Sequence, residues 1–315
     1  YTLALEKIHE GKVSSDLLSI NRNIGLIAGS HTQLSEYTAK EIELYLNCER
    51  DAAFLSVSAQ FNGYPLLIRF AQVEDFVKSI RQLSPGFTAL RIAGLISTQG
   101  FDVYQQLNDE HLPPVLRHEL DEVPLYLLVH IWQALKQSMA GENSVTIGII
   151  GINASCLRLT RLISREGYGR VLGYDNNERL MLSFESEGGL ATNPENVFGN
   201  ADIILLFKNN YTIDDFYRIQ PGQVIYYQVD DEDIDFKMVE EKGLKGAFRI
   251  YPSRAAMLAP GLLLGMIDAG IHLLSDSMLI GIAGMLEKSK SNLDATDQMM
   301  ERVQEKVHRY CVENA

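Results

Sequence analysis

A short polar turn near the middle of the chain has residue types suited to binding the phosphates of a dinucleotide. The apolar residues 145–150 predict a buried strand, Gly151 predicts a turn, and an amphipathic helix follows. A second apolar segment ends in Asp175. In a βαβ unit of this kind, free N–H groups at the helix N-terminus bind a pyrophosphate, and an acidic residue about 20 positions on bonds a ribose hydroxyl. The stretch therefore predicts the opening unit of a Rossmann-like domain.

The glycine pattern of this turn is incomplete. The motif G-x-G-x-x-G reads Gly151-Ile-Asn-Ala-Ser-Cys156 here, so only its first glycine is present. Asn153 tolerates a turn better than most residues, but it has a side chain where a pyrophosphate would lie. Cys156 stands where a glycine lets helix and strand pack closely. The candidate cofactor-binding residues, with NAD(H) as the candidate cofactor, are Gly151, Ile152, Asn153, Ser155, Asp175 and Asn176.

The rest of the sequence alternates strand-like and helix-like segments, which favours an α/β fold with parallel sheets. We expect further strands at 52–57, 64–70, 89–96, 202–207, 223–229 and 247–250, a turn at 61–63, and a loop or short strand at 23–31. We expect helices at 2–9, 35–47 with a serine cap, 73–83, 101–108, 113–120, 123–139, 194–198, 212–219, 236–242, 258–275, 277–288 and 293–312. The expected domains are an N-terminal α/β domain at 1–140, the Rossmann-like domain at 141–290, and a C-terminal helix at 291–315 that docks back or joins a partner.

The composition is that of an ordinary globular protein, and it excludes some partners. The chain has 315 residues, of which 46% are hydrophobic and 22% charged, enough for two domains with full cores. Its net charge of −13 argues against nucleic acid or an anionic membrane as the main partner. No apolar run reaches the roughly 18 residues that span a bilayer. Three widely spaced cysteines without a C-x-x-C motif favour a reducing compartment, so we expect a cytoplasmic protein.

Three stretches around the central turn together resemble the malic enzymes, in the compact form found in bacteria. They are residues 66–87, with Phe-Ala-Gln and Pro-Gly-Phe; residues 116–126, with Asp-Glu-Val-Pro-Leu-Tyr; and residues 251–268, with Tyr-Pro-Ser-Arg, Ala-Pro-Gly and Gly-Met-Ile-Asp. The resemblance implies a two-domain α/β fold of malic-enzyme type and a homodimer. It also implies NAD(P)-dependent oxidation and decarboxylation of malate, which in that family needs a divalent metal, a lysine base and a tyrosine acid.

At the positions that match the family's catalytic motifs, the required groups are missing. Leu26 matches the tyrosine acid, and no lysine matches the base near residues 62–65. Residues 91–94 match the motif with two metal ligands, and residues 127–132 match the motif with the third. The neighbourhood of residues 254–256 matches the paired asparagines that orient the substrate. Because leucine, alanine and glycine side chains offer no oxygen ligands, we expect no divalent metal and name no catalytic residue.

Several polar groups near the expected cleft allow two interpretations. Four of them map to its walls: Arg69, Arg91, His130 and Arg254. They could form a new anion site or pair with local acids such as Asp51, and we favour the pairing. The acidic run 230–235 could bind a cation but is more typical of a solvated helix start, whereas residues 208–210 fit a nucleotide contact and an ordinary turn equally well. Trp132 is typical of a core or an interface, and we assign the cysteines no catalysis.

Three functions stay open, of which the first is favoured. In the first, the chain is a catalytically inactive malic-enzyme homologue that acts as a binding, regulatory or assembly component with a protein partner in a larger complex. In the second, it is an NAD(H)-binding sensor without malate chemistry. In the third, it is an NAD-dependent oxidoreductase repurposed for another carboxylic acid. The joint loss of acid, base and metal ligands favours a protein that is not an enzyme.

Overall fold

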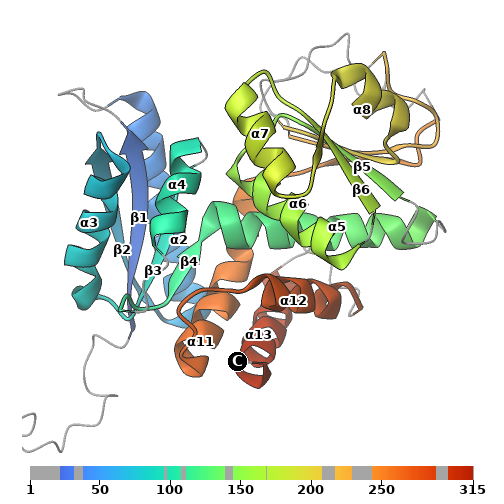
Figure 1. The fold of residues 1–315 in the computed structure, drawn as a ribbon. Helices are drawn as coiled ribbons and strands as arrows, with labels where there is room; N and C mark the ends of the chain where they lie inside the picture. The colour runs from blue at the N-terminus through green and yellow to red at the C-terminus, as the bar shows by residue number, and fades with distance from the viewer. Residues whose placement is uncertain are drawn as a thin grey trace, which may run out of the picture.

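Two parallel β-sheets organise the protein (Figure 1). The computed structural model describes residues 22–31, 38–95, 98–107, 111–138, 145–167, 169–207, 217–228, 243–288 and 297–314. One sheet has the strand order β2-β1-β3-β4, and the other has the order β10-β9-β8-β5-β6-β7. All strand pairs within the described ranges are parallel, which confirms the predicted fold class.

Some predictions fall on residues that lie outside the described ranges. These are the helices at 2–9 and 236–242, most of the helix at 212–219, the acidic run 230–235, residues 208–210, and the domain boundaries near 140 and 290.

The four-stranded sheet is built from the N-terminal part of the chain. Its elements are β1 (Asn23–His31), α2 (Ala39–Ala59), β2 (Asn62–Phe70), α3 (Val73–Leu83), β3 (Ala89–Ala93), α4 (Thr98–Gln106) and β4 (Val115–Arg117). The strand β1 pairs with both β2 and β3, so its apolar side chains lie inside the sheet and are fully buried. Of the two options for residues 23–31, the strand is therefore correct.

The helix α2 corrects three predictions, namely the helix at 35–47, the strand at 52–57 and the turn at 61–63. It begins after Thr38 rather than a serine, because the Thr38 hydroxyl accepts the Glu41 N–H while the Glu41 carboxylate accepts the Thr38 N–H. It then continues through 52–57, which we had predicted as a strand. Its buried residues Glu41, Cys48 and Leu55 recur every seven positions, a helical period that outweighs the apolar composition of 52–57. The helix ends at Gln60 in the left-handed region, so residues 62–63 open β2 instead of forming a turn.

The predicted helix at 113–120 is also wrong. Val115–Arg117 instead pair with β3, and the Val115 N–H donates to the carbonyl of His272. A five-residue π-helix, His118–Glu122, follows and runs directly into α5 (Val123–Ser138). The consecutive prolines before Val115 favour an extended backbone, so they led into a strand rather than a helix.

The six-stranded sheet contains the predicted central unit. Its elements are β5 (Val145–Ile150), α6 (Ala154–Glu166), β6 (Gly169–Tyr174), α7 (Glu178–Ser186), β7 (Leu190–Ala191), α8 (Pro194–Asn200), β8 (Ile203–Leu206), β9 (Val224–Tyr227) and β10 (Gly246–Arg249). The bounds of β8, β9 and β10 lie within one or two residues of the predicted ones. We had not predicted α7 and β7.

The C-terminal helices pack under α5 and the smaller sheet (Figure 1). A 3₁₀-helix at Pro252–Leu258 leads into α11 (Ala259–Ala269), α12 (Asp276–Lys288) and α13 (Asp297–Glu313). A Cβ at Gly261 or Gly265 would come within 2.6 Å of α13, so the two glycines allow α11 and α13 to pack closely. The last helix therefore docks back on its own chain, one of the two predicted outcomes. Among the helices described, none is long and apolar enough to cross a membrane.

Candidate functional site

The predicted nucleotide turn joins β5 to α6. Gly151 has φ +86°, a conformation that favours glycine, and its N–H donates to the Tyr174 carbonyl at 3.0 Å. Asn153 has an extended backbone (φ −138°, ψ −179°), which any residue adopts, so its replacement of a glycine causes no strain. Its Oδ1 accepts the Cys156 N–H at 3.0 Å and thereby caps α6. The side chain thus binds one of the helix-terminal N–H groups that an anion would use.

Asp175 follows β6 at the same edge of the sheet and holds this turn. Its Oδ2 accepts the Ile152 N–H at 2.8 Å, and its Oδ1 accepts the Asn177 N–H at 2.8 Å. Ser155 is buried in the first turn of α6, whereas the Asn176 side chain accepts a hydrogen bond from the Tyr174 hydroxyl at 2.6 Å. The fold therefore brings Asp175 to the backbone of the turn.

The cysteines belong to the interior. Cys156 is fully buried, its Sγ lies 3.5 Å from the Gly151 carbonyl oxygen, and burial raises the pKa of its thiol to about 12. Burial likewise raises the pKa of Cys48 and of Cys311 to about 11. Thiols held neutral in this way are poor nucleophiles, which agrees with assigning them no catalysis.

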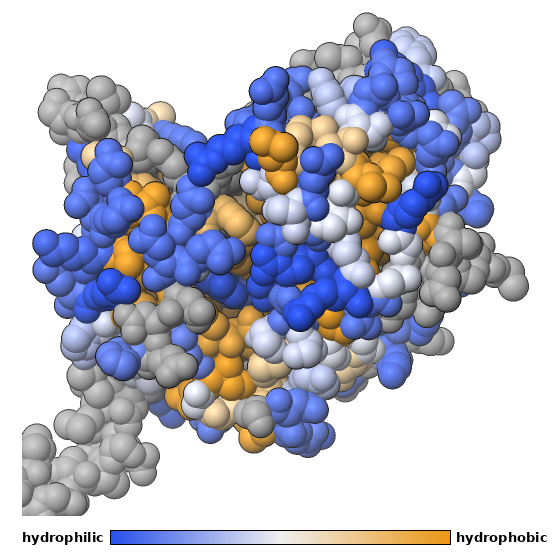
Figure 2. All heavy atoms as spheres, in the orientation of Figure 1, coloured by the Kyte–Doolittle hydropathy of each residue, from blue (hydrophilic) through white to orange (hydrophobic). Residues whose placement is uncertain are grey.

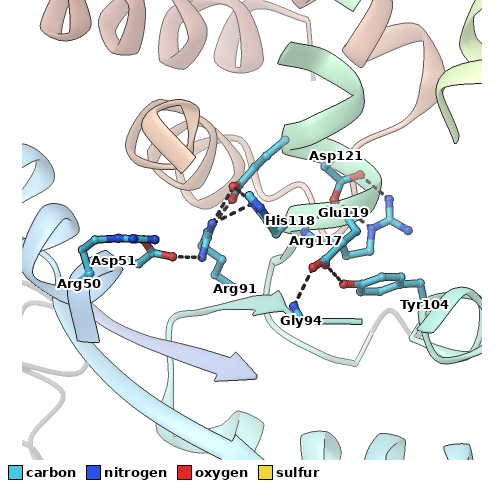
Figure 3. Close-up of polar contacts among 10 residues, drawn as sticks. Arg50, Asp51, Arg91, Gly94, Tyr104, Arg117, His118, Glu119 and Asp121 are labelled. Carbon is cyan, nitrogen blue, oxygen red and sulfur yellow. Dashed lines mark hydrogen bonds and ion pairs between the residues drawn. The ribbon is translucent and has the colours of Figure 1, made fainter. Parts of the chain in front are cut away.

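A second polar region surrounds the π-helix His118–Glu122 (Figure 3). Its three acidic residues are buried, and each has protein donors of its own. Glu119 accepts the Gly94 N–H at 2.7 Å and the Tyr104 hydroxyl. Asp121 accepts from the Arg117 backbone N–H and guanidinium at 2.6–2.9 Å. The wider turn of a π-helix lets neighbouring carboxylates point to different partners, and such turns are frequent at functional sites.

Glu122, the third acid, is bound by Arg91 from β3. The Arg91 Nε and Nη2 donate to its two carboxylate oxygens at 2.6 and 2.7 Å, and Nη1 donates to Asp51 of α2 at 2.8 Å. His118 Nδ1 lies 2.6 Å from Glu122 and 3.0 Å from Arg91 Nη2. Burial alone raises the pKa of Glu122, but Arg91 and His118 outweigh it and lower that pKa to about 2. We call Arg91, Glu122, Asp51 and His118 the Arg91 cluster.

The other residues expected at the cleft walls have separate surroundings. Arg69 forms an ion pair with Glu41 at 2.8 Å, so salt bridges rather than a new anion site are confirmed for Arg69 and Arg91. The ring of His130 packs against Tyr126 at a centroid distance of 4.5 Å. The Arg254 guanidinium lies 4.7 Å from the centre of the Tyr251 ring. Trp132 is 9% exposed and belongs to the core, one of its two predicted places.

The sequence reasoning missed the acids of the π-helix. The signal was the run Arg117-His-Glu-Leu-Asp-Glu122, in which five ionisable residues flank the buried Leu120. A charged run between two apolar segments is normally solvated, and only the pairing of β4 with β3 places this one inside. Within the described ranges, no three or more His, Cys, Asp or Glu side chains form a group that could hold a metal ion.

Comparison with known proteins finds relatives among the malic enzymes. No family model matches the chain. NAD-dependent malic enzyme 1 of Bacillus subtilis (strain 168) is 22% identical over 262 residues, which are 82% of this chain. The crystal structure of the malic enzyme of Pyrococcus horikoshii superposes on 98% of this chain and 80% of its own, with a TM-score of 0.76 and 14% identity. The chain is a malic-enzyme homologue.

A further malic-enzyme structure has the same fold. The NAD-dependent malic enzyme of Thermotoga maritima superposes on all of the homologue and on 90% of its own chain, with a TM-score of 0.79 and 14% identity. The homologue spans 59% of the length of the Bacillus subtilis enzyme. It spans 34% of the NAD-dependent malic enzyme of Geobacillus stearothermophilus, to which it is 20% identical over 163 residues.

Proposed function

We propose that this homologue lacks metal-dependent malate chemistry and acts as a binding, regulatory or assembly component. The observation that carries the proposal is Arg91, which lies in the stretch that resembles the family's motif with two metal ligands. Its guanidinium places a permanent positive charge between Asp51 and Glu122, at 2.8 and 2.6 Å. The Arg91 guanidinium thus supplies, from within the chain, the positive charge that a divalent cation would supply among carboxylates.

The residues of the Arg91 cluster do not fit a divalent metal. A metal ion needs free carboxylate oxygens, and both oxygens of Glu122 already accept hydrogen bonds from Arg91. Binding a dication there would bring it against the buried Arg91 guanidinium, and like charges repel most strongly away from water. We therefore derive no step of a reaction through a metal ion.

The remaining matched positions support the same proposal. Leu26, where the resemblance expects the acid, is buried in β1, and Leu127 and Leu128 of the expected third-ligand motif are buried in α5. All three belong to one hydrophobic cluster that also contains Trp132. Apolar side chains in these places fill the interior without burying unpaired carboxylates.

A direct assay tests the proposal. Purified protein is incubated with malate, NAD⁺ or NADP⁺, and Mg²⁺ or Mn²⁺, and nucleotide reduction is followed by absorbance. We expect no rate above that of a chelated control. A malate-dependent rate that chelation abolishes and added metal restores would show that the chain keeps the family's chemistry.

A second function, an NAD(H)-binding sensor, is favoured by the turn at Gly151. The positive φ of Gly151, the start of α6 and the position of Asp175 after β6 together form the framework of a dinucleotide site. If the site holds NAD(H), α6 would face the pyrophosphate and Asp175 the adenosine ribose. Calorimetric titration with NAD⁺, NADH, NADP⁺ and NADPH tests this function. Saturable micromolar binding that Asp175→Ala weakens supports it, and unchanged affinity in that variant contradicts it.

No observation supports the third hypothesis, an oxidoreductase for another carboxylic acid. Arg69 and Arg91, the arginines expected to bind that acid, are both in ion pairs with the protein's own carboxylates. A homodimer remains part of the main proposal because of the family resemblance, and a protein partner because the acid, base and metal ligands are jointly missing at the matched positions. Light scattering of the purified protein gives its oligomeric state, and co-purification from its native host identifies a partner. A monomer that co-purifies with nothing would contradict the assembly function.

A further inference from the structure

A cavity of about 410 Å³ lies between α6, α4, the π-helix and the residues before α12. Four arginines line it: Arg117, Arg158, Arg161 and Arg165. Three of them come from α6 at spacings of three and four residues, which places them on one face of the helix. On the face drawn in Figure 2, strongly hydrophilic residues gather where α6 and α12 lie in Figure 1. We call this space the α6 cavity.

The arginines of the α6 cavity outnumber their acidic partners. Arg158 and Arg165 share the single carboxylate of Asp276, Arg158 through an ion pair of 2.8 Å. Arg161 pairs with Glu187, and Arg117 pairs with Asp121. Four guanidinium groups thus face three carboxylates, although the whole chain has a net charge of −13. Glu119, the other nearby acid, hydrogen-bonds Tyr104 and Gly94 and does not line the cavity.

Arg158 has a donor that its surroundings leave unused. Its side chain is only 9% exposed, and its Nη2 donates to the Leu274 carbonyl at 3.2 Å. Its buried Nε has no hydrogen-bond partner among the described residues, and neither has the Oδ1 of Asp276, which meets Arg158 Nη2 only as an ion pair. Buried donors in folded proteins nearly always have a partner, so this one points to a polar group from outside the chain.

The electrostatics of Arg158 agree with this interpretation. Burial is the largest cause of the lowered pKa of Arg158, and Arg117 and Arg161 add to it against the opposing effect of Asp121 and Asp276. Positive charges crowded in a partly desolvated space are relieved by a bound anion. Guanidinium groups also match the geometry of carboxylate and phosphate oxygens, which they bind in pairs of hydrogen bonds.

We propose that the α6 cavity binds a small molecule through a phosphate or carboxylate group held by Arg158, Arg161 and Arg165. The apolar side chains of Phe101 and Leu273 complete the wall, so the ligand has a compact organic part beside its anionic group. The proposal depends neither on nucleotide binding at Gly151 nor on the absence of malate chemistry.

Calorimetric titration of the full chain tests the site, with inorganic phosphate and citrate as the two probes at constant ionic strength. At least one probe binds saturably, with a Kd below about 1 mM. Binding of phosphate alone assigns the site to phosphate groups, and binding of citrate alone assigns it to carboxylates. If neither anion binds saturably up to about 10 mM, the proposal is wrong.

Two variants locate the binding. Arg158→Lys keeps the charge but removes the Nε donor, and Arg165→Gln removes a guanidinium whose side chain is 63% exposed, so this variant should fold normally. Each weakens binding about tenfold or more, since each removes a charged donor. The control is Arg179→Gln on α7, an exposed arginine paired with Asp102 that does not line the cavity. Equal affinity in all three variants would place the anion elsewhere and overturn the proposal.

Discussion

The Arg91 cluster and the α6 cavity are both networks of arginines and carboxylates, but they differ in charge balance. In the Arg91 cluster, one guanidinium meets two carboxylates, and its Nε, Nη1 and Nη2 all have partners. In the α6 cavity, Arg158 and Arg165 share one carboxylate, and the Arg158 Nε has no partner among the described residues. A network in which every donor has an acceptor stabilises the fold, whereas a network with more donors than acceptors is suited to binding a ligand.

The difference arises from local backbone geometry. The π-helix directs Glu119, Asp121 and Glu122 toward three separate sets of donors, so each carboxylate has its own compensating partner (Figure 3). The regular turns of α6 instead place Arg158, Arg161 and Arg165 on one face, where their charges accumulate. The Arg117–Asp121 pair links the two regions, because Arg117 lines the cavity and Asp121 belongs to the π-helix.

The strongest test of the comparison is Arg91→Met. The change leaves the buried Glu122 carboxylate without its guanidinium, and an uncompensated buried charge costs about 3–5 kcal/mol in the free energy of unfolding. Urea unfolding of the variant and the parent protein measures the loss. The matched control is Arg179→Met, whose exposed pair contributes about 0–1 kcal/mol.

A double variant separates pairing from packing. In Arg91→Met/Glu122→Leu both charges are removed, and an apolar pair of similar volume often replaces a buried ion pair without loss. The double variant should therefore be more stable than Arg91→Met alone. If it is less stable, contacts other than Arg91, such as His118, hold the Glu122 carboxylate, and the cluster is not the closed ion network described above.

Lowering the pH provides a further test of the Arg91 cluster. The pKa of Glu122 falls from 4.5 to about 2 on folding, so its contribution to stability is complete above pH 4.5 and is lost as the pH falls toward 2. At about pH 3 the loss reaches about 2 kcal/mol, since each pKa unit corresponds to about 1.4 kcal/mol. Glu122→Gln lacks this term, so its unfolding free energy should fall less between pH 7 and 3. Glu41, whose pKa Arg69 also lowers to about 2, titrates in both proteins and cancels in the difference.

The sequence predicts most of the framework that holds these networks. The alternation of apolar segments identifies both sheets, and the pattern around Gly151 places β5, α6 and Asp175 correctly. It fails at 52–57, where apolar residues suggest a strand although their burial follows a helical period, with Leu55 buried and Val57 88% exposed. Composition alone does not separate these cases, since a short apolar run fits either element.

The polar networks depend on contacts that are distant in sequence. Arg91 lies 31 residues from Glu122 and 40 from Asp51, so its pairing was predictable only as a preference for nearby acids. Arg158 meets Asp276 across 118 positions, and no local pattern links them. The three arginines of α6 recur at spacings of three and four residues along one face, but an exposed basic stripe has the same sequence pattern. Only the packing of α6 against the residues before α12 distinguishes a cavity from a solvated face.

The surplus of charge in the α6 cavity is tested by Asp276→Asn. The change keeps the shape of the side chain but removes the carboxylate that Arg158 and Arg165 share, so four guanidinium groups face two acids. Loss of charged hydrogen bonds lowers the unfolding free energy by about 1–3 kcal/mol. The affinity for phosphate or citrate should rise several-fold, as calorimetry measures. An affinity that falls would mean that Asp276 orients the arginines and that charge balance does not control the site.

The smallest expected effect on stability concerns the turn at Gly151. As in the Arg91 cluster, the side chains of this turn accept hydrogen bonds from donors of the protein itself. Asn153→Gly removes the cap on the Cys156 N–H, and an asparagine cap replaced by glycine costs only a few tenths of a kcal/mol. The freed N–H can then bind an anion at the start of α6, so the affinity for NADH should increase. The control is Asn193→Gly, which removes the equivalent cap of α8, where Asn193 accepts the Asn196 N–H at 2.9 Å. If NADH titration gives the same affinity for Asn153→Gly and Asn193→Gly, the Asn153 side chain does not limit nucleotide binding. The hydrogen bonds of the turn would then serve the fold alone, as those of the Arg91 cluster do.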